Sequence, residues 1–253
     1  ALLRGARRPG PLQPGDEVLV PALAWPTTVW PLVQLGLVPV FVDIDPRTLG
    51  LDLESARTAL GPRTRAVFVI HPLGRALDLT ALEPFCSADG LVLLEDTCES
   101  LGAHSGGRHA GTAGWGGSYS FFYSHHISTM EGGMIVTDDD DLVEDLRAFR
   151  AHGWIRDRAD HDRWVAERPD LDPRFLFVTT GYNVRPMEVQ AAIGSVQLRR
   201  LDGLLRAREA LAANVSRWLA ASAPWLDLIG SDRIGATPAD RRARDHSWMT
   251  LPM

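Results

Sequence analysis

Two adjacent histidines are the first candidates for chemistry in this sequence. His125 and His126 lie in the stretch SFFYSHHISTMEGGMIV, between an aromatic run and an acid followed by paired glycines. A shared metal site is a poor interpretation, because adjacent side chains point in divergent directions and no further Cys/His pattern accompanies them. The pair could be unremarkable loop residues, or one imidazole could act as a base, since histidine exchanges protons near neutral pH. Residue types alone leave these last two interpretations open.

An acid and a tryptophan could bind a ring-shaped cofactor. Asp96 ends the apolar run LVLLED, and polar residues at strand ends line the ligand crevice of an open α/β sheet. Asp96 could be a helix cap or a structural hydrogen-bond partner, or it could pair with a protonated ring nitrogen, as in pyridoxal phosphate (PLP) enzymes. Trp25 could pack in the core or provide a flat platform for such a ring.

The chain contains no lysine, and all 26 of its Lys+Arg residues are arginine. A lysine amine is the side chain that forms a Schiff base with a carbonyl group. No side chain in this sequence can therefore tether a carbonyl cofactor or substrate in that way.

Short apolar runs alternate with helical patterns over the first part of the chain, and these elements must position the candidate residues. The apolar runs lack strict polar alternation, as in strands that helices cover on both faces. We expect Asp52 to cap the second helix. The expected strands are 17–22, 38–45, 66–71 and 91–96, and the expected helices are 27–35, 53–60 and 79–88. This repetition predicts an α/β fold with a mostly parallel, doubly wound sheet.

The rest of the chain predicts two more strands and further helices. One long helix, or two joined near Gly203, is expected over 185–220 with Pro186 in its first turn. Gly132 and Gly133 are expected at a tight turn where the backbone approaches its neighbours closely. The other expected elements are a glycine-rich loop at 101–117, strands at 118–123 and 132–137, an amphipathic helix at 140–154, an exposed loop at 156–174 and a strand-like run at 247–253.

Length and composition exclude several classes of function. The 253 residues suffice for one large domain, or one domain plus part of another, and 45% apolar residues are ordinary for a globular protein. No apolar run is long enough to span a membrane, no signal peptide is recognisable, and a net charge of −6 gives no reason to expect nucleic acid as a partner. Cys86 and Cys98 form neither a disulfide framework nor a metal pattern, so a reduced, cytoplasmic location is expected.

Several linked motifs resemble, in order and spacing, those of the DegT/DnrJ/EryC1/StrS family of PLP-dependent sugar aminotransferases. They are PGDEVLVPALAW, VFVDID, EDTCESLGA, SYSFFYSHHISTMEGGMIVTDD, RAHGW and GYNVRPMEVQAAIGSVQLRRLD. The resemblance implies the type I PLP aminotransferase fold, with residues 1–200 as the large PLP-binding domain and 201–253 as a linking helix and the start of a small C-terminal α/β domain. It also implies a truncated chain, with the family's phosphate-binding loop just before Ala1 and the rest of the small domain after Met253.

The same resemblance implies roles for individual residues. Asp96 matches the acid that pairs with the ring nitrogen, Glu99 matches a position near the ring hydroxyl, and Ser120 matches a serine that helps to hold the phosphate. Trp25 falls where an aromatic residue stacks on the ring. Asn183 matches an asparagine that reaches across a dimer interface toward the neighbour's cofactor phosphate. A homodimer with shared active sites is therefore expected.

The sequence departs from the family at His125, where relatives have a lysine five residues after the phosphate serine. This replacement resembles a small subgroup, the 4-keto-6-deoxyhexose 3-dehydratases. The expected activity is removal of the C3 hydroxyl from a nucleotide-linked 4-keto-6-deoxyhexose in deoxysugar biosynthesis. PLP or pyridoxamine phosphate (PMP) is expected to be held noncovalently, with His125 as base and glutamate as amino donor. We expect His126 to be structural or to face the substrate.

Two other functions stay open at this point. One is a sugar aminotransferase of the same family that tolerates histidine, and the other is a non-catalytic family member. A dehydratase route through an iron–sulfur cluster would need cysteines downstream of the histidine, and no cysteine follows Cys98 in this chain. The route that regenerates PMP from glutamate is therefore the expected one.

Overall fold

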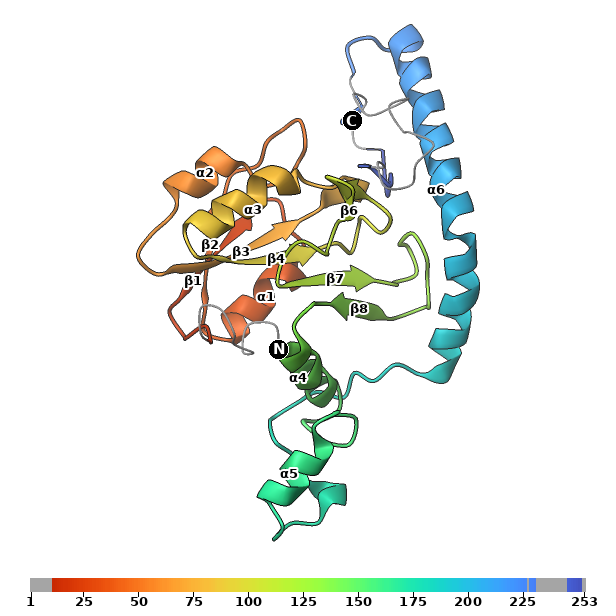
Figure 1. Cartoon of the computed structure of the whole chain (residues 1–253). Helices are drawn as coiled ribbons and strands as arrows, with labels where there is room; N and C mark the ends of the chain where they lie inside the picture. The colour runs from red at the N-terminus through yellow and green to blue at the C-terminus, as the bar shows by residue number, and fades with distance from the viewer. Residues whose placement is uncertain (1–10, 227, 231–244, 252–253) are drawn as a thin grey trace.

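The structure, a computed structural model, describes residues 11–226, 228–230 and 245–251. A six-stranded sheet carries helices against its faces, and the long helix α6 runs along one side of the molecule (Figure 1). The strands are β1 (Glu17–Pro21), β2 (Val38–Val42), β3 (Thr64–Ile70), β4 (Val92–Asp96), β5 (His104–Ser105), β6 (Arg108–His109), β7 (Gly116–Ser120) and β8 (Gly133–Val136). The helices are α1 (Pro26–Gln34), α2 (Leu53–Thr58), α3 (Leu79–Ala88), α4 (Asp140–Arg150), α5 (His161–Glu167) and α6 (Glu188–Ser222), with short 3-10 helices η1 (Pro72–Gly74) and η2 (Pro173–Phe175).

The strand order of the sheet is β2-β1-β3-β4-β7-β8. Strands β2, β1, β3, β4 and β7 run parallel, and β8 is antiparallel to β7. Parallel strands present their carboxyl ends at one edge of a sheet, so Ile70, Asp96 and Ser118, which are paired in register, lie side by side there. The mostly parallel, doubly wound sheet that the sequence predicts is confirmed.

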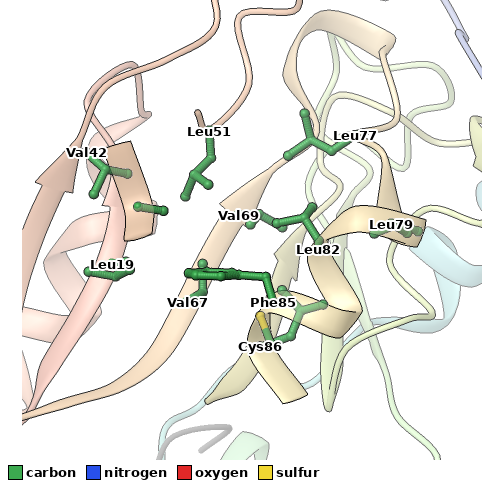
Figure 2. Close-up of a cluster of buried hydrophobic side chains, with 12 residues drawn as sticks. Leu19, Val42, Leu51, Val67, Val69, Leu77, Leu79, Leu82, Phe85 and Cys86 are labelled. Carbon is green, nitrogen blue, oxygen red and sulfur yellow. The ribbon is translucent and has the colours of Figure 1, made fainter. Parts of the chain in front are cut away.

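Residues of the central strands alternate between two hydrophobic clusters. Leu93 of β4 belongs to the cluster that α2 and α3 cover, together with Leu82 of α3. Figure 2 shows this first cluster, with side chains of α3 lying over those of β3. Val92 and Leu94 belong to the opposite cluster, together with Leu32 of α1. Both faces of these strands are buried, which explains why their sequences lack polar alternation.

Aspartate side chains cap the N-termini of three helices. Asp52, Asp78 and Asp139 each accept a hydrogen bond from a backbone N–H of the helix that follows, at 2.7 to 3.0 Å. The predicted N-cap Asp52 is thus confirmed. Helix α4 ends at Arg150, earlier than the predicted end at residue 154, because the chain leaves the helical conformation and His152 has a positive φ of 65°.

The stretch 156–174 is not the exposed loop that the sequence predicts. It contains α5 and η2, and it projects away from the sheet (Figure 1). Local contacts hold it: Arg158 donates hydrogen bonds to Asp160 and Asp145, and its guanidinium lies over the ring of Trp164. None of the residues 156–174 is buried, so the sequence has no apolar periodicity there that would reveal a helix.

Helix α6 passes through Gly203 without a break, so the single long helix is the correct one of the two alternatives. Its N-cap is Met187, whose backbone N–H donates to the side chain of Gln190 at 2.8 Å. Pro186 therefore lies before the helix, and the prediction that it occupies the first turn is wrong.

Two other expectations fail in the loops. The glycine-rich stretch 101–117 contains the short hairpin β5–β6 and the start of β7. Residues 247–251 form no strand, because Trp248 has a positive φ of 51° that interrupts an extended run, although His246 makes an isolated bridge with Arg75. Residues 252 and 253 of the predicted strand lie outside the described residues.

Candidate active site

Asp96 is the last residue of β4, and its side chain faces α1. It shares a face of the strand with Val92 and Leu94, because alternate residues of a strand point the same way. Thr28, in the first turn of α1, donates its hydroxyl proton to Asp96 Oδ2 at 2.7 Å, and the backbone N–H of Cys98 donates to Oδ1 at 3.1 Å. The carboxylate is therefore fixed, yet each oxygen can still accept another donor.

The neighbouring acid, Glu95, points to the opposite face and is enclosed, with 1% exposure. It accepts three hydrogen bonds from backbone N–H groups of the loop 111–114, at 2.7 and 2.8 Å, and pairs with Nε2 of His71 at 2.8 Å. The N–H of Leu77 donates to Nδ1 of His71, so the ring proton is on Nε2. Burial acts to raise the pKa of Glu95, but the bond from His71 and the backbone donors outweigh it, and the pKa lies below its usual value. Glu95 thus anchors the backbone around Asp96.

Trp25 precedes α1 as its N-cap residue and is 70% exposed. The interpretation of Trp25 as a core residue is therefore wrong. Its carbonyl accepts the N–H of Thr28 at 3.0 Å, which places the tryptophan in the same turn as the residue that holds Asp96. An exposed indole in the turn that carries Thr28 fits a platform for a flat ring.

Ser120 and His125 share one short segment at the end of β7. Ser120 lies two residues beyond Ser118, the partner of Asp96 in the adjacent strand β4. Its Oγ accepts the N–H of Phe122 at 3.2 Å, and the carbonyl of Phe122 accepts the N–H of His125 at 3.1 Å. Ser120 therefore lies at the carboxyl edge of the sheet, beside the strand that ends in Asp96, and His125 follows it in the same segment.

The imidazole of His125 is half-buried and meets the ring of Phe122 edge-on, with 5.8 Å between ring centroids. Its Nδ1 is buried and has no hydrogen-bond partner. None of the described residues hydrogen-bonds Nε2, so this nitrogen is the candidate for contact with a reactant. His126, in contrast, is almost completely buried.

Gly132 and Gly133 end this loop, but they do not form the predicted tight turn, because Gly133 is the first residue of β8 and Gly132 directly precedes it. Gly132 has a φ of +155°, and a Cβ there would lie 2.5 Å from Oγ1 of Thr129. A Cβ on Gly133 would lie 2.9 Å from the carbonyl oxygen of Tyr119. The predicted close approach of the backbone is confirmed.

Glu99 and Asn183 occupy different surroundings. Glu99 Oε2 accepts the backbone N–H of Leu73 at 2.8 Å, close to the end of β3. Asn183 is exposed, pairs with Ala151 at the end of α4, and accepts a hydrogen bond from Arg185 at 3.3 Å. Within the described residues no hydrogen bond joins Asn183 to the group around Asp96.

The sequence patterns missed Thr28, although it makes the shortest hydrogen bond to Asp96. The only signal for Thr28 in the sequence was that a hydroxyl side chain falls in the first turn of the helix that follows Trp25.

The described residues hold no cluster of three or more His, Cys, Asp or Glu side chains that could bind a metal ion. None of the helices in the described ranges is long and apolar enough to cross a membrane.

A mostly parallel, doubly wound sheet with an acid and a serine at its carboxyl edge defines an α/β protein whose candidate site lies at that edge. Residues 6–253 match the model of the DegT/DnrJ/EryC1/StrS aminotransferase family, and the chain belongs to this family. The implied fold is therefore confirmed.

Individual relatives show which enzymes within the family the chain resembles. The chain is 42% identical over 217 residues to the GDP-4-keto-6-deoxy-D-mannose 3-dehydratase of Yersinia pseudotuberculosis, covering 85% of this chain and 55% of that protein. The solved Escherichia coli enzyme of that name with bound hydrated PLP has a TM-score of 0.80 at 36% identity, covering 99% of this chain and 61% of that one. A structure of GDP-4-keto-6-deoxymannose-3-dehydratase with a trapped PLP-glutamate geminal diamine has a TM-score of 0.77 at 36% identity, covering 95% and 60%. The chain spans about half the length of the curated relatives that it matches.

Proposed function

We propose that this chain carries the cofactor-binding part of a PLP/PMP-dependent 3-dehydratase that acts on a nucleotide-linked 4-keto-6-deoxyhexose. The observation that carries the proposal is His125, a half-buried imidazole in the segment that follows β7, in a chain without lysine. Its relatives named as GDP-4-keto-6-deoxy-D-mannose 3-dehydratases support this reaction, and a GDP-linked keto sugar is the proposed substrate.

The residues at this edge fit a pyridoxal-type cofactor. Asp96 supplies a fixed negative charge for the ring nitrogen, Trp25 supplies an exposed flat face, and the hydroxyl of Ser120 can donate to a phosphate oxygen. Glu99 is the proposed neighbour of the ring hydroxyl. When bound, PMP supplies an amine that condenses with a ketone and a ring that accepts electrons. Without a lysine, these noncovalent contacts must hold it.

His125 is the proposed base. Loss of the C3 hydroxyl as water requires that a proton leave carbon and that a proton reach the departing oxygen. For Nε2 of His125 to take up the first proton, Nδ1 must carry the proton of the neutral ring, and no described residue hydrogen-bonds Nε2. No described residue accepts a hydrogen bond from Nδ1 to stabilise the doubly protonated ring, so the ring is suited to passing the proton from Nε2 to the departing oxygen.

The remaining assignments rest on the family. Glutamate is the proposed amino donor, supported by the relative solved with a PLP-glutamate adduct. A homodimer in which Asn183 reaches the neighbour's cofactor phosphate is proposed, and the exposure of Asn183 supports it. The division into a large domain (1–200) and a second unit (201–253), a cytoplasmic location, and the absence of nucleic-acid or membrane partners stay predictions.

The test uses the complete protein that carries this chain, loaded with PMP bearing deuterium at C4′, and a nucleotide-linked 4-keto-6-deoxyhexose. The expected product is the 3-deoxy sugar, with loss of the C4′ label. His125→Asn should slow product formation roughly 100-fold or more, because a general base contributes about that much. His161→Gln, a half-exposed histidine of α5, is the matched control and should leave the rate unchanged.

Each other outcome favours an alternative. An aminosugar product would favour a sugar aminotransferase. A protein that binds neither PLP nor PMP, judged by absorbance and mass of the copurifying small molecule, would favour a non-catalytic role. Retention of the C4′ label through turnover would refute His125 as the base.

A further inference from the structure

His126 contacts a distant segment of the chain. It is 3% exposed, and its Nε2 lies 3.1 Å from the carbonyl oxygen of Ser247, 121 residues away. Because a carbonyl only accepts, Nε2 must carry the proton. Nδ1 is buried without a partner, so a second proton there would have no acceptor. Burial, with the charge of Arg208, lowers the pKa of His126 to about 4, and the ring is neutral at physiological pH. It therefore donates one fixed hydrogen bond.

The segment that accepts this bond is itself fixed to the loop after β3. Ser247 is fully buried and donates its N–H to the carbonyl of Gly74 at 2.6 Å. Met249 N–H donates to the carbonyl of Leu73 at 3.0 Å, and Ala76 N–H donates to the carbonyl of Asp245 at 2.9 Å. We call residues 245–249 the brace.

Helix α6 holds the brace from the other side. Arg208 donates to the carbonyls of Trp248 and Met249, both at 2.8 Å. Trp248 is buried and packs with Ala212 and Leu219 of the same helix. The brace is therefore bonded to the loop after β3 on one side and to α6 on the other.

The brace joins two sides of the proposed active site. On one side, Leu73, which accepts from Met249, donates its own N–H to the side chain of Glu99. On the other side, His126 is the residue next to His125. The backbone at His125 and the carboxylate of Glu99 are therefore both tied to the same short segment.

We propose that His126 is a positioning residue, whose hydrogen bond to the brace sets the place of His125 relative to Glu99 and Asp96. The inference rests on the proposed function for its catalytic consequence, but the tether itself is independent of it. The two histidines then have different tasks: His125 exchanges a proton, and His126 fixes the peptide that carries it.

Two substitutions separate the hydrogen bond from the bulk of the ring. His126→Gln can place an amide N–H where Nε2 donates, whereas His126→Leu fills the space without a donor. His161→Gln is the control. Hydrogen–deuterium exchange of the amides at Ala76, Ser247 and Met249 measures the tether directly. We expect His126→Leu to speed this exchange at least about fivefold, as the loss of one hydrogen bond implies, and His126→Gln to stay close to wild type.

Turnover per bound cofactor measures the catalytic consequence. We expect His126→Leu to lower kcat about tenfold while KM and PMP affinity change less than about twofold, and His126→Gln to restore most of kcat. The inference is overturned if His126→Leu leaves exchange unchanged, if His126→Gln exchanges as fast as His126→Leu, or if kcat per bound cofactor does not change. If the wild type forms no deoxy sugar, the proposed function fails, while exchange still decides whether the tether exists.

Discussion

Thr28 and Asp96, which lie 68 residues apart, share a hydrogen bond of 2.7 Å that ties the first turn of α1 to the end of β4. Thr28 also donates its backbone N–H to the carbonyl of Trp25. One residue therefore contacts both the acid and the residue proposed as the platform.

Thr28→Val removes this donor and keeps the shape of the side chain. We expect PLP affinity to fall roughly fivefold, because one hydrogen bond to a charged group contributes about 1 kcal/mol or more. Absorbance titration with PLP measures it. Thr27→Val, at the exposed neighbouring position, is the control, and equal losses in both variants would contradict the assignment.

Glu95→Gln should destabilise the fold by about 3 to 5 kcal/mol, since three backbone donors and His71 would lose their anion. The lowered pKa of Glu95 means that its contribution is present above the unfolded value of 4.5 and is lost as pH falls through the lower folded value. Guanidinium unfolding at several pH values measures both effects. Glu54→Gln, whose side chain is 86% exposed, should change stability by less than about 0.5 kcal/mol.

His126 should make the protein acid-sensitive in a defined window. The unfolded histidine takes up a proton below about pH 6.5, whereas the buried ring does so only near pH 4. Folding is therefore weakened as pH falls from 6.5 to 4, by up to about 3 kcal/mol. His126→Gln should lose less stability over this interval than wild type. An identical pH dependence in the two proteins would show that the ring is not buried neutral.

Two glycines should respond to alanine in opposite directions. Gly132→Ala should cost about 1 to 3 kcal/mol, because of its positive φ and the 2.5 Å approach to Thr129. Gly203→Ala should stabilise by about 0.5 to 1 kcal/mol, since nothing lies within 4 Å of its Cβ position and α6 is continuous there. Thermal unfolding measures both, and destabilisation by Gly203→Ala would contradict a continuous helix.

The sheet could be predicted because its signals are local. Runs of apolar residues marked β1, β3 and β4, and α3 has the predicted bounds of residues 79 and 88. Helix α5 escaped prediction because no buried stripe shapes its sequence, and Arg158 with its acidic partners stabilises it instead. Trp25 could not be placed from its type, because a tryptophan serves equally in a core or on a surface.

Residues of the candidate site could be predicted only where they belong to a recognisable sequence motif. Asp96 and His125 stand out by their place in a motif, so the sequence could predict roles for them. Thr28 and His126 act through partners 68 and 121 residues away, and no spacing in the sequence encodes such pairs. Contacts between residues so far apart in the chain depend on the fold, so they can be identified only once the structure is known.

Glu95 and Asp96 point to opposite faces of β4, where Glu95 bonds the loop 111–114 and His71 while Asp96 bonds Thr28 and the N–H of Cys98. Gaining or losing a single amino acid before Glu95 within this strand would turn both acids to the opposite faces. A loss would bring the shorter carboxylate of Asp96 to the backbone donors of the loop 111–114, whereas a gain would bring the longer carboxylate of Glu95 to Thr28. Evolution or design can therefore vary the loops around β4 far more freely than the number of residues inside it.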